Sequence, residues 1–122
     1  LSTEQHLRWD AIKEKRVLLI TAIADATTLC SFIDKQGIEY NHISFNDHHE
    51  FTASDMERIR IQYEAMEDES AVILTTEKDA QRIVKWMQNL KFATLPILAV
   101  RHRMQWFEKD REIMEKRLNG II

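Results

Sequence analysis

Four short apolar runs, separated by segments with helical spacing, constrain the fold of this chain more than any other feature. The runs span Val17–Ile23, Glu39–Phe45, Ala71–Leu74 and Ile97–Val100. The first and third are almost continuous in Val, Ile and Leu, as is typical of strands that are covered on both faces. The second mixes apolar and polar residues, so we expect it to lie nearer an edge of the sheet.

Between the runs, apolar residues recur at the spacing of one helix face. These stripes are Ala26, Leu29, Cys30 and Ile33; Met56, Ile59, Tyr63 and Met66; and Ala80, Ile83, Val84 and Met87. A leading helix is predicted around Gln5–Lys13, and a last helix from Phe107, Met114 and Leu118, ending at Gly120. Gly37 suits a helix C-terminal cap. Thr52 and Thr76 each begin a predicted capping box.

The alternation of strands and helices predicts right-handed crossovers and a mostly parallel sheet. We therefore expect an α/β fold, a Rossmann-like three-layer sandwich of about four strands, with 2-1-3-4 as the simplest strand order. Its 122 residues fit a single α/β domain, 1–122. The first residue is Leu1 rather than methionine, which suggests a piece of a longer protein, although processing or numbering would also explain it.

Several function classes are disfavoured by what the sequence lacks. The two glycines, Gly37 and Gly120, lie too far apart for a P-loop or a dinucleotide-binding loop, and no serine has flanking glycines. The net charge of −3 gives no basic field for nucleic acid, so no nucleic-acid partner is expected. The single cysteine, Cys30, is predicted to be a buried structural thiol. No apolar stretch is long enough to span a membrane.

Polar side chains follow the predicted strands, and the carboxyl ends of parallel strands are where ligands gather. Asp25 follows the first strand, Asp47, His48 and His49 the second, and Arg101-His102-Arg103 the fourth. One histidine could be aimed at a ligand and be held by a carboxylate, or the segment could be a polar loop that caps a helix through Thr52. Asp47, His48 and His49 are too close in sequence to supply three metal ligands easily, so no metal site is predicted.

The third strand is followed by two hydroxyls, two acids and a lysine at a predicted helix start. These residues are Thr75, Thr76, Glu77, Lys78 and Asp79. A helix N-terminus attracts anions, and Lys78 would strengthen that attraction. The alternative is a structural role, in which Thr76 caps the helix and the two acids favour its dipole.

Two of these segments resemble motifs of one family. Ser44–Thr52 resembles an F-x-D-H-H/Y-x-F motif and Ile73–Ala80 resembles a T-T-E-K-D motif of the bacterial tetraacyldisaccharide 4′-kinases, the lipid A 4′-kinases. The resemblance covers about Val17 to Val100, and the two motifs together are specific. It implies a lobe that lies C-terminal to an ATP-binding P-loop domain, which this sequence does not contain.

The resemblance also implies an activity. The family transfers the γ-phosphate of ATP, with Mg²⁺, to the 4′-hydroxyl of a tetraacyldisaccharide 1-phosphate lipid A precursor. This step belongs to lipopolysaccharide biosynthesis at the cytoplasmic side of the bacterial inner membrane. His48, with Asp47 before it, corresponds to the histidine that helps an N-terminal aspartate activate the sugar hydroxyl. Thr75–Asp79 correspond to residues that support the cleft and its cofactor.

The lobe by itself is expected to be soluble and inactive and to bind neither ATP nor Mg²⁺, because it has no P-loop. One departure is that Ala22, Asp25 and Ala26 replace small, amide and proline positions of the family, and a carboxylate at Asp25 would repel phosphate. A stand-alone flavodoxin-like interaction or regulatory domain is the alternative interpretation, and a purely structural domain is a third. Finding a P-loop domain upstream in the same reading frame would separate them.

Overall fold

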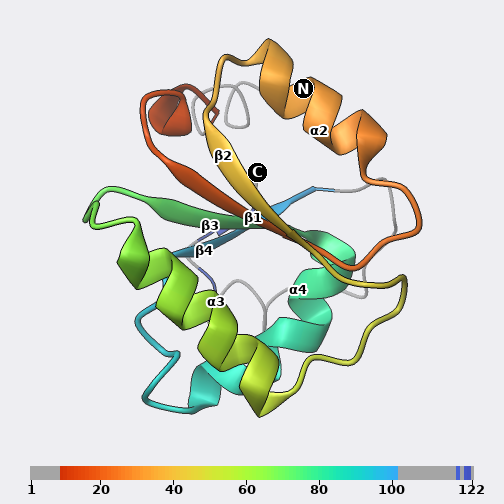
Figure 1. Ribbon diagram of the computed structural model, residues 1–122, viewed down its shortest axis with the longest axis vertical. Coiled ribbons are helices and arrows are strands. Elements are labelled where there is room, and N and C mark those ends of the chain that lie inside the picture. The colour runs from red at the N-terminus through yellow and green to blue at the C-terminus, as the bar shows by residue number, and fades with distance from the viewer. Residues whose placement is uncertain (1–8, 102–117, 119, 122) are drawn as a thin grey trace.

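The computed structural model describes residues 9–101, 118, 120 and 121 and contains a parallel sheet between two layers of helices (Figure 1). In chain order the elements are β1 (Val17–Thr21), α2 (Thr27–Lys35), β2 (Tyr40–Ser44), α3 (Ala53–Ala65), β3 (Val72–Thr76), α4 (Glu77–Ile83), the 3₁₀ helix η1 (Val84–Gln88), β4 (Ile97–Val100) and β5 (Gly120–Ile121). Residues 9–12 are also helical, within the predicted leading helix.

The sheet confirms the predicted α/β class and the order of the four predicted strands. Its full order is β2-β1-β3-β4-β5, and every neighbouring pair is parallel. The mixed second run forms β2, which is the edge strand that its composition predicted. A fifth, short strand was not predicted: Gly120, expected to end a helix, lies in β5 and pairs with Leu98. Phe107 and Met114 of that predicted helix lie outside the described residues.

Alternation along β1 divides the core into two halves. Leu18 and Ile20 face a cluster formed with α3, α4 and η1, whereas Val17 and Leu19 face a cluster formed with residues 9–12 and α2. Figure 1 shows α2 on one side of the sheet and α3 and α4 on the other. Strands buried on both faces explain why the runs that form β1 and β3 are continuous in apolar residues.

Helix α2 ends as its glycine predicts but packs less tightly than its stripe suggested. Gly37 has φ +74°, in the left-handed region, and its N–H donates to the carbonyl of Asp34 at 3.0 Å. Ile33 is fully buried, but Cys30 is only half-buried. The prediction of a buried thiol is therefore wrong. The physical reason is that Cys30 packs against the edge strand β2, where no further strand covers it. Its sulfur lies 3.9 Å from Nδ1 of His42 on that strand.

The two predicted capping boxes differ in the structure. At α3 the box is complete, because Thr52 accepts from the Asp55 N–H and the Asp55 carboxylate accepts from the Thr52 N–H. At α4, Thr76 accepts from the Asp79 N–H in the same way. The Asp79 carboxylate does not return to the Thr76 backbone, so the second box is incomplete. The third apolar stripe is buried as predicted, although the helix tightens to 3₁₀ geometry after Ile83.

His42 on β2 is expected to make the stability of the fold depend on pH. Its Nε2 lies 2.8 Å from Oγ1 of Thr21, and although part of the side chain is exposed, burial of the rest lowers the pKa of His42 below its usual value. Between the lowered pKa of the folded state and about 6.5 in the unfolded chain, the unfolded state binds more protons. This contribution is complete above pH of about 6.5 and is lost as the pH falls through the folded-state pKa.

We therefore expect the free energy of unfolding to fall below pH of about 6.5 in the wild type and to fall less in His42→Gln. Denaturant titrations of both proteins at a series of pH values measure the difference. Parallel pH profiles for the two proteins would show that His42 contributes nothing to it.

Candidate functional site

The segments that follow the carboxyl ends of β1, β2 and β3 meet at one end of the sheet. They surround the backbone of Ala22, which is fully buried. The Ala22 N–H donates to Oδ2 of Asp79 at 2.9 Å. The Ala22 carbonyl accepts from the N–H of His48 at 3.1 Å. One residue after β1 thus ties together the loop that follows β2 and the helix that follows β3.

Two hydrogen bonds from the Arg82 side chain join these contacts into a closed ring of hydrogen bonds. Arg82 on α4 donates through Nη1 to Oδ1 of Asp79 at 3.3 Å and through Nη2 to Nδ1 of His48 at 3.1 Å. The ring therefore runs from Ala22 to Asp79, to Arg82, to His48 and back to Ala22. Every step is a hydrogen bond, and the Asp79 carboxylate is completely buried. Such a closed set of contacts fixes where the His48 ring lies.

The contact with Arg82 also determines which ring nitrogen of His48 carries the proton in this arrangement. A guanidinium can only donate hydrogen bonds, so Nδ1 of His48 must be the acceptor. In the neutral ring the proton then resides on Nε2. That atom lies 3.5 Å from Oδ2 of Asp47, and both side chains are exposed at the edge of the sheet. The pair therefore places an N–H and a carboxylate at the exposed surface beyond the end of β2.

The backbone of His48 adopts a conformation that side chains rarely take. The His49 N–H donates to the carbonyl of Asn46 at 3.0 Å, which closes a tight turn, and His48 within it has φ +61°. A residue other than glycine in this region costs of the order of 1 kcal/mol or more, and such residues cluster at functional sites. Histidine is among the residues enriched at positive φ, so the conformation marks His48 as a candidate site residue and no more.

His49 has a different environment from His48. Its ring stacks on Phe45 at 4.7 Å between centroids, and its Nε2 lies 2.6 Å from Oδ2 of Asp55. Burial raises the pKa of Asp55, but hydrogen bonds from His49 and Thr52 outweigh that effect and lower it. His49 thus contacts the capping box at the start of α3 and stabilises it.

The second motif is mostly built into the fold. Thr75, Thr76, Glu77 and Asp79 are all buried, whereas Lys78 is half-buried. The Thr75 hydroxyl donates to the carbonyl of Ile20 at 2.8 Å, between β3 and β1. The Thr76 hydroxyl donates to Oδ2 of Asp79 at 2.9 Å. The contacts of these two hydroxyls are therefore with the protein itself, and a cofactor role for this segment stays a prediction.

Some polar residues predicted at the carboxyl ends of the strands are not part of the hydrogen-bond ring around Ala22. Asp25 is exposed and accepts from the Thr27 N–H at 2.9 Å; its hydrogen bonds with Thr27 lower the pKa of Asp25. Arg101 is exposed, and His102 and Arg103 lie outside the described residues. Arg82 and the backbone of Ala22 belong to the ring but were not predicted from the sequence. Only one signal pointed to Arg82: it lies one helical turn after the last acid of the second motif.

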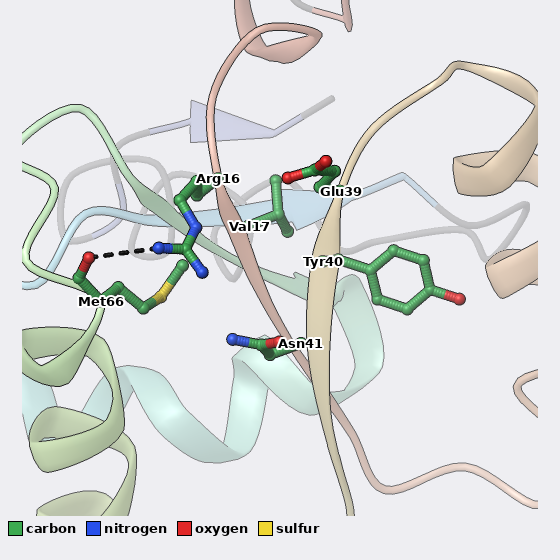
Figure 2. A pocket seen from close by; sticks show the side chains of 6 residues that line it. All are labelled: Arg16, Val17, Glu39, Tyr40, Asn41 and Met66. Atoms are coloured by element: carbon green, nitrogen blue, oxygen red, sulfur yellow. Dashed lines mark hydrogen bonds between the residues drawn. The ribbon is translucent and has the colours of Figure 1, made fainter.

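The residues that the structure describes contain no cluster of metal-ligand side chains. None of their His, Cys, Asp and Glu side chains forms a group of three or more that could hold a metal ion. A pocket of about 250 Å³ lies at the opposite end of the sheet, where β1 and β2 begin. Figure 2 shows its lining, in which Arg16 donates to the carbonyl of Met66 and the Tyr40 ring points away from Arg16. No helix within the described ranges is long and apolar enough to cross a membrane.

Residues 2–120 match the model of one protein family, described as Tetraacyldisaccharide-1-P 4'-kinase. The chain belongs to this family. The match contains the whole ring around Ala22 and both motifs that resembled this family, so family membership and site geometry concern the same residues.

Individual members of the family are similar to the chain over most of its length. It is 31% identical over 83 residues to the tetraacyldisaccharide 4'-kinase of Bacteroides thetaiotaomicron, covering 68% of this chain and 22% of that protein. It is 30% identical over 112 residues to the tetraacyldisaccharide 4'-kinase of Rhodopseudomonas palustris, covering 91% of this chain and 32% of that protein. The chain thus spans about a fifth to a third of these relatives. No solved structure matches it.

Proposed function

We propose that this chain is the C-terminal lobe of a lipid kinase. The full-length enzyme transfers the γ-phosphate of ATP to the 4′-hydroxyl of a tetraacyldisaccharide 1-phosphate lipid A precursor, at the cytoplasmic side of the bacterial inner membrane. The observation that carries the proposal is the position of His48. A histidine from a family motif is held by a ring of hydrogen bonds at the edge of a parallel sheet where ligands usually bind.

In this proposal His48 orients a base and is not itself the base. Because its Nδ1 accepts from Arg82, the neutral ring offers a donor at Nε2. A donor can hold a carboxylate in the position and ionised state needed to take the proton of the sugar hydroxyl. Asp47 is one such carboxylate, 3.5 Å away. An aspartate of the N-terminal domain, reaching this edge when the lobes meet, is the other.

ATP and Mg²⁺ would be held by the N-terminal P-loop domain, which is the lobe's first partner. The residues of this chain do not fit that task, because they include no glycine-rich loop and the hydroxyls of Thr75 and Thr76 bond within the fold. Phosphoryl transfer depends mainly on positioning and charge stabilisation. The lobe contributes one positioned imidazole to a site that the other domain must complete.

We therefore expect nucleotide binding and turnover in the full-length protein and neither in the isolated lobe. Calorimetry of the 122-residue chain with magnesium-ATP should show no binding, whereas the full-length protein should convert the disaccharide to a product phosphorylated at the 4′ position, identified by mass spectrometry. A micromolar Kd for ATP on the isolated chain would contradict this division of labour. Absence of turnover in the folded full-length protein would contradict the function itself.

A further inference from the structure

We propose that Arg82 is a positioning residue for this site: it sets the orientation and the tautomer of His48. The inference rests on the proposed function of His48 and adds to it a residue that neither motif contains. Arg82 follows the second motif on α4, and its guanidinium bridges the buried Asp79 carboxylate and the exposed His48 ring.

The anchoring of Arg82 explains how it can hold an exposed ring still. Its side chain is 20% exposed, and the carboxylate of its partner Asp79 is fully buried. That carboxylate is itself fixed by the Ala22 N–H and the Thr76 hydroxyl, each at 2.9 Å. Asp79 is therefore held in place by groups at the ends of β1 and β3. Arg82 connects this fixed carboxylate to the exposed His48 ring.

Arginine suits this task better than lysine. Its guanidinium is planar and permanently charged and donates in fixed directions through different nitrogens, here Nη1 to Asp79 and Nη2 to His48. Lysine would supply a point charge without those directions. Because the guanidinium cannot accept, it selects the form of His48 with the proton on Nε2, the atom that faces Asp47. A wrong tautomer would turn an acceptor toward that carboxylate.

A spectroscopic test separates this role from a merely structural one. Nitrogen NMR of the ring of His48, in the 122-residue chain at a pH where the ring is neutral, should show the Nε2–H tautomer predominating in the wild type. Arg82→Ala should give a mixture of tautomers, and Arg82→Lys should restore the wild-type state only in part. A single, unchanged tautomer in folded Arg82→Ala would overturn the proposal.

A double-mutant cycle in the full-length kinase provides the kinetic test. Arg82→Ala should lower kcat by about 10–100-fold, the scale on which partners that orient a functional histidine act. The same change in a His48→Ala background should lower it little further, because the two residues act as a unit. Arg60 supplies a matched control: it is 24% exposed, pairs with Glu57 on its own helix α3, and Arg60→Ala should leave kcat unchanged.

The possible outcomes distinguish the two proposals. If His48→Ala has no effect on turnover, the proposed function of this site fails, and the inference about Arg82 fails with it. If His48→Ala lowers kcat and Arg82→Ala does not, or lowers it by the same factor in both backgrounds, only the positioning role of Arg82 is wrong. Melting curves for each variant show whether a loss of turnover reflects a loss of folding.

Discussion

Replacing Ile20 by Asp is expected to abolish the folded state of this chain. Ile20 is completely buried on β1, between Ile43 of β2 and Thr75 of β3. The described residues of the cluster around Ile20 are apolar and would offer a carboxylate no cationic partner. Burying an unpaired charge costs several kcal/mol in addition to the lost apolar contacts. A domain has only about 5–15 kcal/mol of stability to lose.

Circular dichroism and thermal melting test this expectation, with Ile61→Asp as a matched control. Ile61 lies on α3 and is 53% exposed, so the same substitution should change stability by no more than about 0.5 kcal/mol. A cooperative melt of Ile20→Asp near the wild-type Tm would mean that β1 is not a buried inner strand of the sheet.

The strands were predictable because burial on both faces leaves a direct trace in the sequence. Four consecutive residues of β1, from Val17 to Ile20, are apolar because both cores need them. The mixed pattern of β2 reflects its edge position, where Asn41 and His42 are exposed. The two-residue strand β5 was missed, because a strand that short has no periodicity to detect.

The candidate site was predictable only in part, because its contacts are non-local. The motifs brought attention to Asp47, His48 and Asp79, and the predicted strand order placed β2 and β3 on either side of β1, with their carboxyl ends at the same end of the sheet. That Asp79 binds the backbone of Ala22, 57 positions away, could not be read from a local pattern. An aspartate three residues after a threonine looks like a capping box, and the structure instead uses its carboxylate across the sheet.

The second large effect is expected at His48. In the full-length kinase, His48→Ala should lower kcat by about 10²-fold or more, the usual scale of general acid–base assistance. The physical reason is that no other group in the ring around Ala22 offers a donor at the position of Nε2. His49→Phe should cost far less, because it keeps the ring stacked against Phe45 and loses only the hydrogen bond to Asp55.

The strained turn supplies a variant that separates activity from folding. Asparagine tolerates the left-handed region in which His48 lies at φ +61°. His48→Asn should therefore keep the Tm close to the wild-type value or above it, although it removes the imidazole. A loss of turnover in this variant cannot then be attributed to a loss of the turn.

The central claim is that this lobe contributes His48 to phosphoryl transfer, and one measurement tests it most directly. Turnover of the tetraacyldisaccharide 1-phosphate is measured with saturating magnesium-ATP for full-length wild type, His48→Ala, His48→Asn and His49→Phe, each shown to be folded. The account predicts that both His48 variants lose about 10²-fold or more in kcat and that His49→Phe stays near the wild type. Near-normal turnover in folded His48→Ala would contradict it and leave the loop after β2 as the capping segment of α3.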